Sequence, residues 1–342
     1  MLKKINTLRY PISSKPEFGV PLEVSEGIFL LKMPIPYALD HINLWLLRDN
    51  SGWTIVDSGY YSEEAAALWD KVLTIFCDQQ PIQKIIITHF HPDHVGMAQW
   101  LANKTMAPIH MSQIEYLTAH MACQTHSEPQ KASRQQYFKR FGLTQEQLEG
   151  LQGRIGGYVN GVPEAPITYN RMVDTESLSI NNETWSLLQF SGHSPGHICL
   201  FNAERKILIS GDQILPSISP NISVNFNETE ADPLADYLSS LTKLATLDKD
   251  TLVLPAHGRT FIGVQERSNT LTQGHLDSLE QLRAFCQTPR TGLEVIEEMF
   301  GNRLSIFNLS LATGEAMAHL NYLIGTAELS RSDEDVYHYK TN

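Results

Sequence analysis

The chain has little of what a membrane protein or a disulfide-stabilised secreted protein requires. It contains no apolar run long enough to span a bilayer, and Pro11 and Pro16 break the segment that follows the lysines at positions 3 and 4. We therefore expect neither a signal peptide nor a membrane contact. Only 4 cysteines occur, and none forms a Cys-x-x-Cys pair. Such isolated cysteines predict reduced thiols and a cytoplasmic location.

Positive charge is also scarce. The sequence has 26 Lys and Arg against 38 Asp and Glu, which gives a formal net charge of -12. Because an acidic surface repels a phosphate backbone, we expect no nucleic-acid partner. The sequence also lacks a Gly-x-Ser-x-Gly nucleophile elbow, a P-loop and a dinucleotide fingerprint at a strand–helix junction. A covalent serine mechanism therefore has no support.

A dense group of metal-ligand residue types follows the apolar run at residues 84–88. Three imidazoles and a carboxylate occur close together, at His89, His91, Asp93 and His94. Imidazole nitrogens and carboxylate oxygens are ligands that zinc and similar divalent metals prefer. The spacing suits two adjacent metals. His89 and His91 would face one metal, and Asp93 and His94 would face the other.

Three further strand ends carry the same residue types. His193 and His197 lie in a Gly-His-Ser-Pro-Gly-His run after an apolar strand, and Asp212 follows the apolar stretch 208–211. His257 follows an expected strand at residues 252–254, after Pro255 and Ala256. Each of these sites lies where an apolar strand gives way to a loop, often beside Gly or Pro, so their ligands can point toward a common centre.

In the order of these motifs, from about residue 20 to about residue 265, the chain resembles the metallo-β-lactamase superfamily, especially its glyoxalase II-like branch. The resemblance implies an α+β fold, the αββα sandwich in which two sheets pack face to face with helices outside. It also implies a dinuclear metal site. One metal would be held by His89, His91 and His193, the second by Asp93, His94 and His257, and Asp212 would bridge them.

The resemblance implies a metal-dependent hydrolase that uses a metal-bridging hydroxide. Two divalent ions lower the pKa of a bound water, so that hydroxide exists near neutral pH. Zn²⁺ is favoured, and Mn²⁺ or Fe²⁺ are alternatives. We expect Asp93 and Asp212 to be the catalytic carboxylates and the substrate to be a small-molecule ester, thioester or lactone. Asp57 is expected to orient a ligating imidazole, and His197 to have a hydrogen-bonded structural role.

The motifs divide the chain into two expected domains. Residues 1–264 would form the catalytic domain, with a polar helical insertion at about 112–170 that either covers the active-site mouth or is a solvated addition. Residues 265–342 read as three helices and a short β-like tail, with the third helix expected at residues 314–329. This order is similar to the winged-helix-like module of some superfamily members. Such a module would act as a lid or make a homodimer contact.

Three alternative functions stay open at this stage. A metal-dependent ribonuclease or phosphodiesterase would use the same two-metal geometry, but residues 314–329 contain no Lys or Arg to contact phosphates. A di-iron redox protein is compatible with the ligand types, although no flavodoxin-like phosphate loop follows the sandwich. A non-catalytic binding module would be favoured if ligands were missing, and none of the expected ligands is missing.

Overall fold

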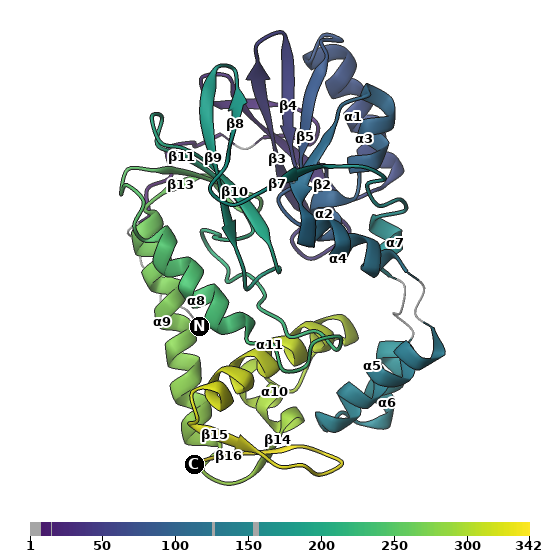
Figure 1. Cartoon of the computed structure of the whole chain (residues 1–342), viewed down its shortest axis with the longest axis vertical. Helices are drawn as coiled ribbons and strands as arrows, with labels where there is room; N and C mark the ends of the chain where they lie inside the picture. Colours follow the sequence, from purple (N-terminus) through teal and green to yellow (C-terminus); the bar gives the residue numbers. More distant parts are fainter. Residues whose placement is uncertain (1–7, 15, 125–126, 153–156) are drawn as a thin grey trace.

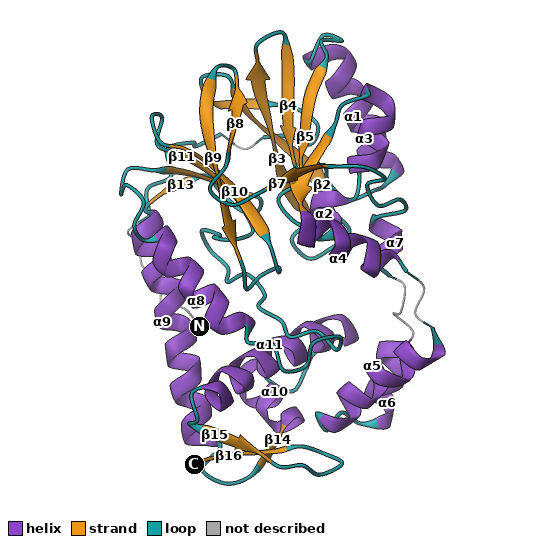
Figure 2. Ribbon diagram, viewed as in Figure 1, coloured by secondary structure: helices purple, strands orange, loops and turns teal. Residues whose placement is uncertain are grey.

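Apolar stretches separated by turn residues form two β-sheets that pack against each other, as Figure 2 shows. The computed structural model describes residues 8–14, 16–124, 127–152 and 157–342. Helices α1 (Glu63–Lys71) and α3 (Ala98–Thr105) cover the outer face of one sheet, and a helical unit lies at one end of the sandwich (Figure 1). The predicted α+β sandwich with a C-terminal helical module is therefore confirmed.

The first sheet has the strand order β1-β2-β3-β4-β5-β6-β7. Strands β4, β5 and β6 run parallel, so their carboxyl ends meet at one edge, where Asp57 and His89 follow β4 and β5. Its strands are β1 (Leu22–Ser25), β2 (Ile28–Pro34), β3 (His41–Asp49), β4 (Gly52–Val56), β5 (Ile82–Ile86), β6 (Ile109–Ser112) and β7 (Asn170–Met172).

The second sheet has the strand order β13-β12-β11-β10-β9-β8. Because β11 and β12 are parallel neighbours with Gly211 opposite Pro255, the residues that follow them, Asp212 and His257, emerge side by side. Its strands are β8 (Ser177–Ile180), β9 (Glu183–Phe190), β10 (His197–Asn202), β11 (Ile207–Gly211), β12 (Leu252–Pro255) and β13 (Phe261–Ile262).

One apolar cluster joins the two sheets. It includes Leu31, Trp45 and Ile85 from the first sheet and Trp185 and Leu200 from the second, all buried. Burial of a side chain of this size contributes roughly 2–3 kcal/mol relative to its exposure. The cluster therefore fixes the two strand-end edges against each other.

Two helical segments differ from what the sequence pattern favours. Residues 93–101 have a pattern that favours one continuous helix but form parts of two helices separated at Gly96 and Met97. The helix expected at residues 314–329 begins at Ile306 and ends at Gly325. In the described residues, no helix combines the length and apolar character required to cross a bilayer. The helices are α1 (Glu63–Lys71), which continues as a π-helical turn (Val72–Phe76), α2 (Pro92–Val95), α3 (Ala98–Thr105), α4 (Gln113–Cys123), α5 (Glu128–Arg140), α6 (Gln145–Gln152), α7 (Tyr158–Gly161), α8 (Pro233–Leu244), α9 (Val264–Phe285), α10 (Gly292–Phe300) and α11 (Ile306–Gly325).

The C-terminal unit consists of α9, α10, α11 and a small sheet of order β14-β16-β15. A second apolar cluster joins this unit to the outer face of the second sheet, because Leu208 and Val253 of that sheet share it with Leu279 and Leu320. The winged-helix resemblance and the domain boundary at residue 264 stay predictions. The small strands are β14 (Arg290–Thr291), β15 (Leu329–Arg331) and β16 (His338–Thr341).

The helical insertion at residues 112–170 has two parts with different neighbours. Helix α4 packs beside β6 in the sandwich, whereas α5 and α6 lie against the C-terminal unit (Figure 1). The backbone N–H of Leu293 donates to the carbonyl of Phe141, and Phe141 is fully buried. The second half of the insertion thus extends the C-terminal unit.

Candidate metal centre

The strand-end edges of both sheets bring the seven expected ligand residues into two neighbouring groups. In each group the candidate ligand atoms lie within 4.8 Å of one another. The first group contains His89, His91, His193 and Asp212, and the second contains Asp93, His94 and His257.

Hydrogen bonds fix which nitrogen can face a metal in four of the five ligand imidazoles. His193 Nδ1 lies 2.9 Å from the carbonyl of Asn221, and His257 Nδ1 lies 3.0 Å from the carbonyl of His41. Because a carbonyl only accepts, each Nδ1 carries the proton. Each Nε2 is then the nitrogen left to face a metal, and these nitrogens lie in the two groups.

Asp57 sets the same tautomer on the first loop. Its carboxylate accepts from Thr88 N–H at 2.8 Å, from the Thr88 hydroxyl at 2.9 Å and from His94 Nδ1 at 2.8 Å. Because the Thr88 hydroxyl donates its one hydrogen bond to the Asp57 carboxylate, its oxygen is an acceptor toward His89 Nδ1, at 3.0 Å. Nδ1 is therefore the engaged nitrogen in both rings, which leaves Nε2 of His89 and of His94 as the nitrogen that can face a metal. Asp57 takes a left-handed φ of 61°, a conformation that Asp tolerates better than most residues.

Asp212 lies between the two groups. Its Oδ2 is 3.5 Å from His193 Nε2 and 3.6 Å from His94 Nε2, and its Oδ1 is 3.5 Å from His257 Nε2. Asp93 Oδ2 approaches His257 Nε2 at 3.2 Å. Asp212 therefore faces both groups, and its bridging role stays a prediction.

The pKa values in the site follow from burial and from these close charges. Burial, together with the neighbouring imidazoles, lowers the pKa of His91 to about 3, so this ring is neutral near pH 7. Although burial raises the pKa of Asp93, His94 and His257 lower it to about 2. The pKa of Asp212 is shifted in the same direction. Burial lowers the pKa of His94, but Asp57, Asp212 and Asp93 outweigh it and raise the value.

The donor set fits divalent cations. Ionised carboxylates and imidazole nitrogens face one another in a buried space, and this combination suits zinc-type ions. Among the described residues, His94 Nε2 and Asp212 Oδ1 are buried without a hydrogen-bond partner. Buried polar atoms in native proteins nearly always have a partner. A cation at each group would give these two atoms theirs.

His197 lies outside both groups. Its Nε2 accepts the backbone N–H of Asp212 at 3.2 Å, and its ring stacks on that of His89 with a centroid distance of 4.8 Å. Burial lowers the pKa of His197, which keeps Nε2 available as an acceptor. This contact places His197 behind the ligand residues, where it holds the start of the Asp212 loop.

Glu115, at the start of α4, links the two histidine loops and was missed in the sequence. Its Oε2 accepts from Phe90 N–H at 2.9 Å, and its Oε1 accepts from the Ser194 hydroxyl at 2.7 Å and from Gly196 N–H at 2.6 Å. In the sequence, Ser112 followed by Glu115 has the spacing of a helix N-terminus, so nothing there indicated a role for Glu115 in this site.

Comparison with known proteins agrees with this geometry. Residues 38–257 match the family described as the metallo-beta-lactamase superfamily, and residues 279–342 match the C-terminal domain described as metallo-beta-lactamase-like. The chain belongs to the metallo-β-lactamase superfamily. Its histidine and aspartate residues are positioned to bind metal ions, as the superfamily assignment leads one to expect.

Two solved structures of the superfamily are similar over nearly the whole chain. A beta-lactamase domain protein from Burkholderia ambifaria is 37% identical, has a TM-score of 0.91, and the match covers 98% of this chain and 99% of that one. A metallo-beta-lactamase family protein from Thermus thermophilus is 27% identical, with a TM-score of 0.77 and coverage of 94% and 100%. Among curated relatives, the probable metallo-hydrolase YqjP of Bacillus subtilis is 24% identical, covering 87% of this chain and 92% of YqjP.

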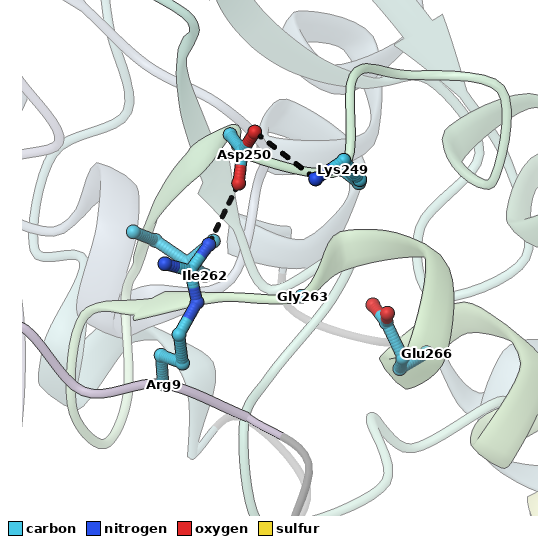
Figure 3. A pocket seen from close by; sticks show the side chains of 6 residues that line it. All are labelled: Arg9, Lys249, Asp250, Ile262, Gly263 and Glu266. Atoms are coloured by element: carbon cyan, nitrogen blue, oxygen red, sulfur yellow. Dashed lines mark hydrogen bonds and ion pairs between the residues drawn. The ribbon is translucent and has the colours of Figure 1, made fainter.

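A surface pocket lies apart from the superfamily's metal-binding residues. Asp250 pairs there with Arg9 at 2.7 Å and with Lys249 at 3.4 Å, as Figure 3 shows. Both cations are therefore already paired with an acid, and none of the lining residues belongs to either ligand group. The pocket is lined by Arg9, Lys249, Asp250, Ile262, Gly263 and Glu266.

Proposed function

We propose that this protein is a dinuclear metal-dependent hydrolase of the glyoxalase II-like branch, acting on a small-molecule ester, thioester or lactone. The observation that carries the proposal is the pair of adjacent ligand groups joined by Asp212. We infer that His89, His91, His193 and Asp212 hold one divalent ion, and that Asp93, His94 and His257, with Asp212, hold a second. Zn²⁺ is the favoured ion, with Mn²⁺ and Fe²⁺ as alternatives.

Two named relatives support an acyl substrate. Hydroxyacylglutathione hydrolase GloC of Haemophilus influenzae is 28% identical over 55% of this chain and 74% of its own length. The human acyl-coenzyme A thioesterase MBLAC2 is 22% identical over 70% of this chain and 80% of its own length. Both names describe thioester hydrolysis by those proteins. We therefore place a thioester first among the substrates to be tested.

The side chains of the site divide the work of hydrolysis. When bound, the two cations would supply a water that ionises near neutral pH and would polarise the scissile carbonyl. Asp93, ionised because its pKa is about 2, can accept a hydrogen bond from the attacking water and orient it. Because its pKa is so low, the Asp93 carboxylate does not hold a proton near neutral pH. Asp57 holds the His94 ring in the orientation that places its Nε2 in the second group.

Tyr158 is not suited to protonate the leaving group. Its hydroxyl donates to the carbonyl of Phe90 at 2.5 Å, and burial raises its pKa further above the ordinary range. Its hydrogen bond instead ties α7 to the first histidine loop. Tyr158 therefore stabilises the loop that carries His89 and His91.

Elemental analysis and a substrate panel test the proposal together. Protein purified without chelator should contain two divalent ions per chain and should hydrolyse members of a panel of esters, thioesters and lactones. Two irons per chain would shift the assignment to redox chemistry. Failure to bind metal after reconstitution, or failure to hydrolyse any panel member when loaded, would contradict the proposal.

A further inference from the structure

Helix α11 of the C-terminal unit lies directly against the segment that follows Asp212. Val224 N–H donates to the carbonyl of Gly314 at 3.0 Å. A Cβ at Gly314 would come within 2.6 Å of Ser223 Oγ and 3.1 Å of the Val224 carbonyl. Glycine in this helix therefore permits a close approach that a larger residue would prevent. Asn321, further along the same helix, donates to the carbonyls of Thr229 and Ala231.

Asn221 connects this helix to a candidate metal ligand. Its backbone carbonyl accepts from His193 Nδ1 at 2.9 Å. Its side-chain Nδ2 donates to Glu315 Oε2 at 2.9 Å, and its Oδ1 accepts from the Ser223 hydroxyl at 2.6 Å. Both ends of the Asn221 amide are thus anchored while its carbonyl orients the imidazole. Glu315 is the member of this chain of contacts that belongs to the C-terminal unit.

We propose that Glu315 is a positioning residue for the metal centre, acting through Asn221 to hold His193 in its metal-binding orientation. This inference rests on the proposed function, because it takes His193 to be a ligand. The Asn221 carbonyl fixes the proton on Nδ1 and aims Nε2 at the first group. Groups that hydrogen-bond a metal ligand directly typically change metal affinity 10–100-fold when removed, and Glu315, one contact further out, should act at the lower end of that range. The C-terminal unit therefore takes part in metal binding.

Two substitutions at Glu315 separate positioning from simple packing. Glu315→Leu removes the acceptor of the Asn221 amide, whereas Glu315→Gln keeps an oxygen in the same place. We expect Glu315→Leu to weaken Zn²⁺ binding about 10-fold and to alter the visible spectrum of the Co²⁺-loaded protein. Glu315→Gln should stay within about 2-fold of the wild type in affinity and keep its spectrum. Glu297→Leu, on the exposed face of α10, is the matched control for loss of an acid in this unit.

A second site keeps the test decisive if Glu315→Leu does not fold. Asn221→Ala removes the link to Glu315 and leaves the carbonyl in the chain, so it should weaken Zn²⁺ binding to a similar degree. Where both single variants fold, the double variant should bind Zn²⁺ no more weakly than the weaker single variant. The two residues act through one hydrogen-bonded chain, so the effects of their substitutions on affinity do not add.

The outcomes that contradict the inference differ from those that contradict the proposed function. Unchanged Zn²⁺ affinity and an unchanged Co²⁺ spectrum in Glu315→Leu, with only a lower unfolding midpoint in chelator, would show a packing role and overturn the inference alone. A wild-type protein that binds neither Zn²⁺ nor Co²⁺ would overturn the proposed function and this inference with it.

Discussion

At the scale of single residues, the site depends on which atom of each side chain is already engaged. Thr88 has one hydroxyl proton, and it donates that proton in a hydrogen bond to the Asp57 carboxylate. That single donation decides the tautomer of His89, and a carbonyl decides that of His193. A sequence shows that these residues are present but not which nitrogen of each is free. The ligand types were therefore predictable, and the tautomers were not.

His197 and Asp212 should respond differently to truncation. His197→Ala leaves the buried N–H of Asp212 without its acceptor and removes a packed ring, so we expect a loss of about 2–4 kcal/mol in unfolding free energy with metal retained. Asp212→Ala should retain the fold and lose metal. Urea unfolding and elemental analysis measure both effects. Loss of a metal from His197→Ala, with both metals kept by Asp212→Ala, would reverse the assignment.

Glu115→Gln should disturb both histidine loops. Either orientation of the amide sets its NH₂ group against a backbone N–H, that of Phe90 or that of Gly196. We expect a loss of about 1–3 kcal/mol in unfolding free energy and faster loss of metal to a chelator. Ser194→Ala, which removes one donor and leaves the two backbone donors, is the control and should have a smaller effect. Equal metal retention in Glu115→Gln and wild type would exclude this role.

At the scale of secondary-structure elements, helices with a clear apolar stripe were predictable, and close backbone approaches were not. The helix expected from residue 314 begins at Ile306, because Ser305 caps it through the N–H of Asn308. Gly314 looked like a helix start but is an interior position required by the contact with Ser223. Gly96 marks a similar case, since a Cβ there would meet the carbonyl of Gly161, and the expected helix is interrupted beside it.

The pairing of distant elements could not be derived from composition either. Asp212 and His257 are adjacent only because β11 and β12 are parallel neighbours. The order of motifs supplied the ligand set through its resemblance to a family, and this order also implied the two sheets. The packing of α5 and α6 against the C-terminal unit had no counterpart in the sequence pattern, because it depends on surface shape at Phe141 and Gly292.

The contact between α5 and α10 can be tested with one methyl group. A Cβ at Gly292 would lie 2.5 Å from the ring of Phe141, which is fully buried and cannot move aside. We expect Gly292→Ala to lower the unfolding free energy by about 1–3 kcal/mol. Gly325→Ala is the control, because within the described part of the chain its Cβ would come within 4 Å of Asp232 Oδ2 alone, at 3.5 Å. Equal unfolding midpoints for Gly292→Ala and wild type would contradict this packing.

At the scale of the whole molecule, Glu315 should make stability depend on pH. Burial raises its pKa from 4.5 to about 7, while Asn221, its direct partner, opposes the shift. Between these values the folded protein binds more protons than the unfolded chain. The stabilisation from this group is therefore complete below about pH 4.5 and is lost as the pH rises through about 7. The difference between the two pKa values limits this contribution to the unfolding free energy to about 3 kcal/mol.

Glu315→Gln, which is neutral at every pH, isolates this contribution. The variant and wild type should have similar unfolding free energies near pH 4.5, and the variant should be the more stable by up to about 3 kcal/mol at pH 8. Urea unfolding of both proteins at several pH values, in the presence of chelator, measures the difference. A difference that stays constant from pH 5 to pH 8 would contradict the expected titration.

The apolar cluster that joins the second sheet to the C-terminal helices has a consequence for biosynthesis. Its members range from Tyr137 to Tyr339 along the chain. During translation the second sheet is complete once residue 262 has left the ribosome, and α8, which packs on β9, is already made. Helices α9 and α11, which pack on α8, follow later. At roughly 5–20 residues per second, the apolar side chains of this cluster stay incompletely covered for several seconds. Chaperone dependence of the nascent chain should therefore be concentrated in that interval.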